Sequence, residues 1–121
     1  MKRYTKEHEW VELNGNVATV GISAHAADEL GDITYVELPA NGKTVTKGAA
    51  MAVDESVKAA SDVFAPVSGT VVDVNSALEA DPAMLNSAAE TDGWFCKISG
   101  VAAADLDGLM TVEQYAEYAK K

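Results

Sequence analysis

The sequence predicts a mainly β fold, a small sandwich or barrel, with short helices and a helix at the C-terminal end. Short apolar segments follow one another closely along the chain, and Asn, Gly and Pro residues separate them. Closely spaced short strands are typical of small sandwiches and barrels. The chain has 121 residues, of which 48% are hydrophobic, enough for one core without disulfides or a structural metal. We therefore expect a single domain over residues 1–121, with a β-sandwich core over about residues 4–98 and a helical tail over about residues 102–120.

The first two expected strands form a hairpin. We expect a short strand within Tyr4–Leu13, where the chain changes from charged to apolar, and a second over Val17–Ile22. Asn14 and Gly15 lie between them. An Asn-Gly pair between apolar runs favours a tight turn, because both residues tolerate positive φ.

A short helix is expected next, over Ala24–Leu30. Ser23 can cap its first turn, and Gly31 can end it. The strands expected after this helix are short, and they cover Ile33–Leu38, Thr44–Val45, Met51–Val53, Val63–Phe64 and Gly69–Val74.

The C-terminal stretch changes to helix-forming residues. Thr111 and Gln114 match a capping box, in which each side chain binds the backbone N–H of the other residue. We expect a terminal helix packed on the sandwich, with these residues on its inner face: Val112, Tyr115, Ala116 and Ala119.

Charge and composition restrict the class of protein. The formal net charge of −10 argues against a nucleic-acid partner, because phosphate binding depends on clustered Lys and Arg. No apolar run is long enough to cross a bilayer, and the basic N-terminus has no apolar stretch behind it to form a secretory signal. The one cysteine, Cys96, suits a reducing compartment and is interpreted as a small strand residue. We expect a cytoplasmic monomer without a membrane partner, and no metal site, because His8, His25 and Cys96 lack metal-ligand spacing.

Lys58 lies in the segment that carries the most functional information. Small residues flank it on both sides, and apolar strands are expected before and after it. A lysine that another enzyme modifies needs a protruding turn whose neighbours leave it accessible, and small residues leave that space. From the residues alone, the alternative is an ordinary surface lysine at a turn.

Glu55–Asp62 and Ala65–Gly69 closely resemble the lipoylation segment of the glycine cleavage H-protein family. The resemblance continues in order from about Tyr4 to Ile98, and the helical tail is also similar to the family. The other matching residues are His8-Glu9-Trp10, Val20-Gly21-Ile22, Leu30-Gly31-Asp32, Leu38-Pro39, Val74-Asn75, Leu78, Pro82, Asn86, Gly93-Trp94 and Lys97-Ile98.

The resemblance implies a barrel-sandwich hybrid, the lipoyl/biotinyl type of β-sandwich, with Lys58 at a β-turn. It implies that lipoic acid is the cofactor and is joined covalently to Lys58 by an amide. Glycine decarboxylase (P-protein) would load the arm with an aminomethyl group. Aminomethyltransferase (T-protein) would pass the one-carbon unit to tetrahydrofolate and release ammonia, and dihydrolipoamide dehydrogenase (L-protein) would reoxidise the dithiol. These three enzymes and the lipoyl-attaching enzymes are the expected partners, and the chain is expected to be a carrier without catalytic residues.

Glu9 and Asp62 are the candidate residues of a cleft that shelters the loaded arm. Glu9 lies in the family-like entry motif, and Asp62 lies four residues beyond Lys58. Burial of the loaded arm would exclude water, and a protonated amine favours a nearby carboxylate. The alternative is that both residues are solvated surface acids.

Four other motif residues are interpreted as structural. Trp10 and Trp94 are expected to be core aromatics. Gly69 and Gly93 are expected in turn geometry that a side chain would disfavour.

The sequence departs from the family's pattern at two places. Asp54 stands where a small residue is common, and Ser87–Asp92 lacks a Pro-Tyr pair that often precedes Gly93. Two alternative functions stay open. One is another lipoyl or biotinyl carrier domain, although such domains centre their lysine in Asp-Lys-Ala or Met-Lys-Met, and Lys58 follows Val57. The other is an H-like protein that serves lipoyl relay or redox regulation.

Overall fold

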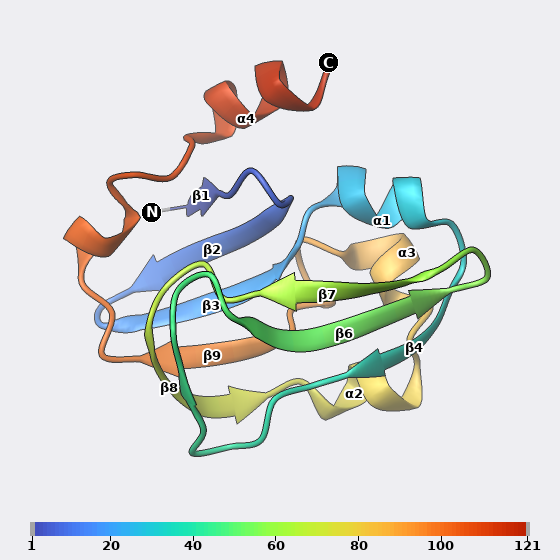
Figure 1. Ribbon diagram of the computed structural model, residues 1–121, viewed down its shortest axis with the longest axis horizontal. Helices are drawn as coiled ribbons and strands as arrows, with labels where there is room; N and C mark the ends of the chain where they lie inside the picture. The colour runs from blue at the N-terminus through green and yellow to red at the C-terminus, as the bar shows by residue number, and fades with distance from the viewer. Residues whose placement is uncertain (1, 121) are drawn as a thin grey trace.

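The computed structural model describes residues 2–120, so Met1 and Lys121, the two ends of the expected domain, lie outside the described residues. Within that range, nine strands form two antiparallel sheets that face each other, and short helices flank them (Figure 1). The expected mainly β sandwich with short helices and a C-terminal helix is confirmed.

The larger sheet contains the first hairpin of the chain. Its strands are, in spatial order, β1 (Lys2–Tyr4), β2 (Glu9–Asn14), β3 (Val17–Ile22), β9 (Cys96–Ser99), β8 (Gly69–Val74) and β5 (Thr44–Val45). Asn14 pairs with Val17 at the end of the β2–β3 ladder, and Gly15 has φ +64. The predicted hairpin is therefore confirmed, with a turn residue in the left-handed region that glycine adopts without strain.

The smaller sheet carries Lys58. It consists of β4 (Ile33–Glu37), β6 (Ala50–Ser56) and β7 (Ala60–Phe64), with β6 in the centre. Strands β6 and β7 are longer than expected. The small and polar residues on either side of the Lys58 turn also pair across the two strands, and the last pair before the turn is Glu55 with Ala60. This hairpin projects beside the first helix in Figure 1.

The helices are short. The described helices are α1 (Ala24–Leu30), α2 (Ser76–Ala80), α3 (Met84–Ala88), a 3-10 turn (Ala103–Leu106) and α4 (Val112–Ala119). Ser23 accepts a hydrogen bond from the Ala26 N–H and Gly31 ends α1, as predicted, whereas α2 and α3 were not expected. Among residues 2–120, no helix is long and apolar enough to cross a membrane.

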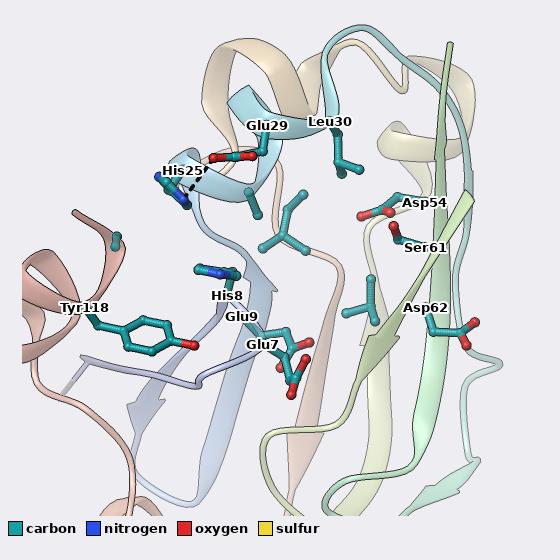
Figure 2. A pocket seen from close by; sticks show the side chains of 14 residues that line it. Glu7, His8, Glu9, His25, Glu29, Leu30, Asp54, Ser61, Asp62 and Tyr118 are labelled. Atoms are coloured by element: carbon teal, nitrogen blue, oxygen red, sulfur yellow. Dashed lines mark ion pairs between the residues drawn. The ribbon is translucent and has the colours of Figure 1, made fainter. Parts of the chain in front are cut away.

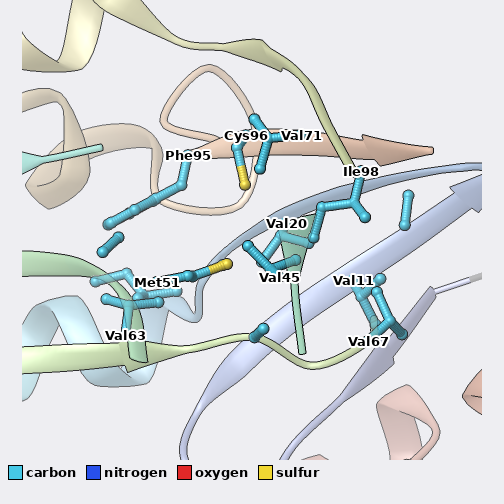
Figure 3. Packing of buried hydrophobic residues seen from close by; sticks show 14 of the residues in the cluster. Val11, Val20, Val45, Met51, Val63, Val67, Val71, Phe95, Cys96 and Ile98 are labelled. Carbon is cyan, nitrogen blue, oxygen red and sulfur yellow. The ribbon is translucent and has the colours of Figure 1, made fainter. Parts of the chain in front are cut away.

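The core fills the space between the two sheets (Figure 3). Val20 of the larger sheet lies near Met51 of the smaller one, Val11 lies beside Val67, and all four are buried. Cys96 is fully buried among them, and burial raises the pKa of its thiol to about 12. The interpretation of Cys96 as a small core residue of a strand is therefore confirmed.

Helix α4 contacts β1 through only a few side chains on one of its faces. The predicted capping box forms, because Thr111 Oγ1 accepts from the Gln114 N–H and Gln114 Oε1 accepts from the Thr111 N–H. Tyr115 is buried and stacks on Tyr4 with 4.2 Å between ring centroids. The expected inner face was partly wrong: Ala119 is half-buried, but Val112 and Ala116 are exposed, because the contact surface that β1 offers is narrow.

Two of the motif glycines are required by close packing. A Cβ at Gly69 would lie 2.2 Å from the Ser99 carbonyl oxygen, and one at Gly93 would lie 2.8 Å from that of Ala88. The expected turn geometry that disfavours a side chain is confirmed for Gly93, which lies in a turn, and was wrong for Gly69, which begins β8. Neither residue has a positive φ. Trp10 is a core residue, as expected, and its indole N–H donates to the Ala89 carbonyl.

Candidate functional site

Lys58 lies at the tip of the β6–β7 hairpin. The Ser56 N–H donates to the Ala59 carbonyl oxygen at 2.9 Å, which closes the turn. The Ser56 hydroxyl accepts from the N–H groups of Lys58 and Ala59, at 3.1 and 3.3 Å. Lys58 itself is exposed, so a short side chain fixes the turn while the lysine remains accessible.

The lysine side chain lies against the C-terminal end of α1. Its Nζ is 3.4 Å from the Glu29 carbonyl oxygen, and a Cβ at Gly31 would lie 3.5 Å from its Cε. Gly31 has φ +78, and Asn86 fixes this connection by donating to the Gly31 carbonyl at 2.7 Å and accepting from the Ile33 N–H at 3.0 Å. The side chain of Lys58 therefore rests against a well-defined helix end.

A pocket of about 510 Å³ lies beside this end of α1, between α1, the start of β2, the β6–β7 hairpin and α4 (Figure 2). Five of its lining residues are acidic: Glu7, Glu9, Glu29, Asp54 and Asp62. None of the described residues that line it is Lys or Arg. Lys58 is not one of the lining residues, but its Nζ contacts the backbone carbonyl of Glu29, which is one of them.

Glu9 is held in the wall of this pocket. It is 3% exposed at the start of β2, and its Oε1 accepts from the Thr5 hydroxyl at 2.6 Å. Its Oε2 accepts from the Phe64 N–H of β7 at 3.2 Å, so Glu9 joins the two sheets. Burial raises the pKa of Glu9, and these two hydrogen bonds oppose the rise.

Asp62 lies at the outer rim of the same pocket. It pairs with Val53 across the β6–β7 ladder and is exposed. Figure 2 shows its carboxylate directed away from the interior, whereas Ser61, on the other face of β7, points inward. The structure thus places both predicted acids in the lining of one pocket, Glu9 inside and Asp62 at the edge.

Asp54 is a residue of the pocket that the sequence did not identify as functional. It pairs with Ser61 across the hairpin and is 2% exposed. Within residues 2–120, its Oδ1 is the one buried side-chain oxygen or nitrogen without a hydrogen-bond partner. Burial raises the pKa of Asp54 to about 6. Two features of the sequence could have drawn attention to Asp54. It departs from the family pattern, and it lies two residues after Ala52, so the two side chains share one face of the strand, on which Ala52 is buried.

His8 and His25 complete the wall near α4. His8 has φ +69, and its Nδ1 lies 2.7 Å from the hydroxyl of Tyr115. Burial, and then the neighbouring His25, lower the pKa of His8, so its ring is neutral at pH 7. The Nε2 of His25 lies 3.4 Å from the carboxylate of Glu29. Among the described residues, no three His, Cys, Asp or Glu side chains are arranged to hold a metal ion.

The chain is similar to proteins of one family over almost its full length. The family model described as glycine cleavage H-protein matches residues 2–121. The glycine cleavage system H protein of Phenylobacterium zucineum is 55% identical over 113 residues, which are 93% of each chain. That of Caulobacter vibrioides is 52% identical over 116 residues, which are 96% of each chain. The crystal structure of a glycine cleavage system H protein from Mycobacterium marinum superposes with a TM-score of 0.88, at 33% identity, covering 99% of this chain and 97% of that one.

Proposed function

Because the chain belongs to the glycine cleavage H-protein family, we propose that it carries a lipoyl group on Lys58 and shuttles an aminomethyl group between the enzymes of glycine cleavage. The observation that supports this most directly is the position of Lys58. It is exposed at a turn fixed by Ser56, and its Nζ contacts the backbone carbonyl of Glu29, a residue that lines an acidic pocket. A carrier lysine needs this combination of access and a place where its arm can return.

The residues around Lys58 fit a lipoyl amide. Amide formation removes the positive charge of Nζ but leaves one N–H, which can still donate to the Glu29 carbonyl. The side chains next to Lys58 on the chain are Val57, which is 70% exposed, and Ala59. Neither blocks the approach of a lipoyl-attaching enzyme. The lipoyl group, when bound, supplies the dithiol that carries the one-carbon cargo and the electrons.

The length of the arm matches the two places it has to reach. At roughly 1.2 Å per bond, about twelve bonds from Cα to sulfur span ~14 Å. An arm of this length can enter the active site of a docked partner, and it can also lie back in the pocket of about 510 Å³ beside α1. Tethering keeps its effective concentration high at each of these sites.

Glu9 and Asp62 are the residues that we assign to sheltering the loaded arm. A protonated amine is attracted to carboxylates, and Glu9 presents one from inside the pocket while Asp62 presents one at its rim. Ile22, Leu30 and Val63 supply apolar walls that exclude water from the labile cargo. To test this, each acid is replaced by its amide, and release of ammonia from loaded protein is timed. Unchanged lifetimes would remove both residues from the assignment.

We assign four kinds of partner to the chain: glycine decarboxylase, aminomethyltransferase, dihydrolipoamide dehydrogenase and the enzymes that attach lipoate. The chain acts as a non-catalytic carrier, and the chemistry is shared between the arm and the partner active sites. Its net charge of −10 suits docking on basic surfaces. The single buried thiol of Cys96 suits the reducing cytoplasm.

Intact mass spectrometry of the protein from its native host, grown on glycine, tests the proposal. We expect the mass to increase by one lipoyl group, and peptide mapping to place the increase on Lys58. An unmodified chain under these conditions would contradict it. Incubation with the purified partner enzymes and labelled glycine then distinguishes a glycine shuttle, which acquires and passes on label, from a lipoyl relay, which does not.

A further inference from the structure

The carboxylate of Asp54 is buried in the pocket without a partner for one of its oxygens. The residue is 2% exposed, and Oδ1 receives no hydrogen bond from any described residue. Figure 2 shows the side chain directed from β6 into the space beside Leu30 and Ser61. A buried carboxylate oxygen without a donor is costly, so this arrangement indicates a ligand that supplies one.

Other buried polar groups of the chain contrast with Asp54, because they have structural partners. Asn75 donates to the carbonyl oxygens of Asp92 and Trp94, and the hydroxyl of Ser23 lies 2.6 Å from that of Tyr115. Glu9 uses both of its oxygens. Oδ1 of Asp54 makes no such contact within residues 2–120, so it does not hold the fold together in the way that these groups do.

Asp54 also has no cationic partner among the described residues, and His25 of the pocket lies 3.4 Å from the carboxylate of Glu29 instead. The charge of Asp54 contributes to raising the pKa of Glu9, so the two carboxylates repel each other across the pocket. His8 is neutral at pH 7, and none of the described lining residues is Lys or Arg. A cation bound between Asp54 and Glu9 would relieve this repulsion.

We propose that Asp54 binds the protonated primary amine carried at the end of the arm, and that it shares this amine with Glu9. The inference rests on the proposed function, in which Lys58 carries the arm. It adds a third carboxylate, Asp54, to Glu9 and Asp62, the two acids already assigned to this pocket. Since a primary ammonium has three N–H donors, it can serve Oδ1 of Asp54 and Glu9 together.

Distances along the strands are consistent with this placement. Asp54 lies on β6 and precedes Lys58, in the hairpin turn, by four residues, or at most ~13 Å at about 3.3 Å per residue. Phe64, which binds Glu9, follows Lys58 by six residues, or ~20 Å on the same scale. The sulfur of the arm extends ~14 Å from Cα, and the two further bonds, S–C and C–N, bring the amine to ~17 Å. The extended arm is therefore long enough to bring the amine to the depth of Asp54 and toward that of Glu9.

The lifetime of the loaded protein tests the proposal. Water hydrolyses the loaded arm by forming a C–O bond and breaking the C–S and C–N bonds, so that R–S–CH₂–NH₃⁺ and H₂O give R–SH, CH₂O and NH₄⁺. We expect Asp54→Asn to release ammonia about tenfold faster than the wild type, since hydrogen bonds to charged groups are among the strongest in proteins. Asp73→Asn, which removes an exposed acid of β8, is the matched control and should keep the wild-type rate.

A second experiment measures amine binding to the protein without its lipoyl arm. Methylammonium chloride is titrated into the unlipoylated chain, with sodium chloride at equal ionic strength as the control, and the carboxyl ¹³C resonance of Asp54 is followed against pH. We expect methylammonium to lower the pKa of Asp54, because the cation stabilises the carboxylate. Tetramethylammonium, which has no N–H donor, should have a smaller effect.

The two readouts separate failure of this inference from failure of the proposed function. If loaded Asp54→Asn decays at the wild-type rate, the inference is overturned while the shuttle function stands. If the native chain carries no lipoyl group, the proposed function fails and the methylammonium titration decides whether Asp54 binds a primary amine. An Asp54 resonance that titrates identically in methylammonium and sodium chloride would then overturn the inference.

Discussion

The Nζ of Lys58 lies 3.4 Å from the carbonyl oxygen of Glu29, in the last turn of α1. Carbonyls at the C-terminal end of a helix have no intrahelical donor and carry partial negative charge, so they attract a lysine. This hydrogen bond is long and exposed to solvent, and it is therefore weak. It orients the lysine side chain but does not immobilise it. Lys58 can leave Glu29 for a modifying enzyme at little cost and return afterwards with one N–H still available.

Lys58→Arg tests the identity of the modified residue. Arginine keeps the positive charge but cannot form the lipoyl amide, so we expect the mass increase of one lipoyl group to disappear. The free energy of unfolding should change by less than ~0.5 kcal/mol, because the side chain is exposed and its one contact is weak. Lys47→Arg, at another exposed lysine, is the control and should remain fully lipoylated. Lipoylation of the Lys58→Arg chain would place the modification elsewhere.

Features that depend on neighbouring residues in the sequence were predictable. The Asn14-Gly15 hairpin, the Ser23 cap of α1 and the Thr111 capping box each rest on side chains that bind backbone groups a few residues away. The exposed turn position of Lys58 was likewise predictable from the small residues that flank it. In each case the information is local, so the sequence alone was sufficient.

Features that depend on distant parts of the chain were not predictable. Helices α2 and α3 have five residues each, and neither has a side-chain cap; they are held mainly by burial of Leu78 and Leu85 in the core. Asp54 is buried because α1 and β7 cover the end of β6, and this requires the tertiary fold. The sequence indicated that Asp54 was unusual but not that it faces a cavity.

Gly69→Ala tests the close packing between β8 and β9. The new Cβ would lie 2.2 Å from the Ser99 carbonyl oxygen, a backbone atom that cannot move without disturbing the ladder. We expect a loss of roughly 1–3 kcal/mol in the free energy of unfolding, measured by urea denaturation. Gly108→Ala is the control, because nothing lies within 4 Å of its Cβ position and its φ is not positive. Equal stability of the two variants would show that the ladder adjusts freely.

Tyr115→Phe tests how α4 is held on the sandwich. The tyrosine hydroxyl lies 2.6 Å from the Ser23 hydroxyl and 2.7 Å from His8 Nδ1, and Phe would leave both without this partner. Since Ser23 is fully buried, we expect a loss of about 1–2 kcal/mol in the free energy of unfolding. Tyr118→Phe removes a more exposed hydroxyl that donates to the Lys6 carbonyl and should cost under ~0.5 kcal/mol. Comparable losses in both variants would contradict a special role for the Tyr115 hydroxyl.

The buried Asp54 makes the stability of the unloaded protein depend on pH. Burial raises its pKa from 3.8 to about 6, so between these values the folded state binds more protons at Asp54 than the unfolded state does. The contribution of Asp54 to the free energy of unfolding therefore falls as pH rises from 4 to 6, and it stays low above pH 6. The total loss is about 3 kcal/mol, because each pKa unit corresponds to about 1.4 kcal/mol. His8, whose pKa burial lowers, contributes with the opposite sign.

Asp54→Asn measures this contribution, because the His8 contribution is common to both proteins and cancels in their difference, and the smaller effect of Asp54 on the pKa of Glu9 has the same sign. We expect the unlipoylated variant to be more stable than the wild type by roughly 1–3 kcal/mol at pH 7.5, and of equal stability at pH 4, where Asp54 is protonated and neutral. Urea denaturation at the two pH values measures the difference, and exposed Asp73→Asn should change stability by less than ~0.5 kcal/mol at either. A stability gain that does not grow with pH would contradict the buried charge. If it does grow, the chain retains at Asp54 a charge that destabilises the unloaded fold, which is the cost expected of a residue that binds a cation only when the arm is loaded.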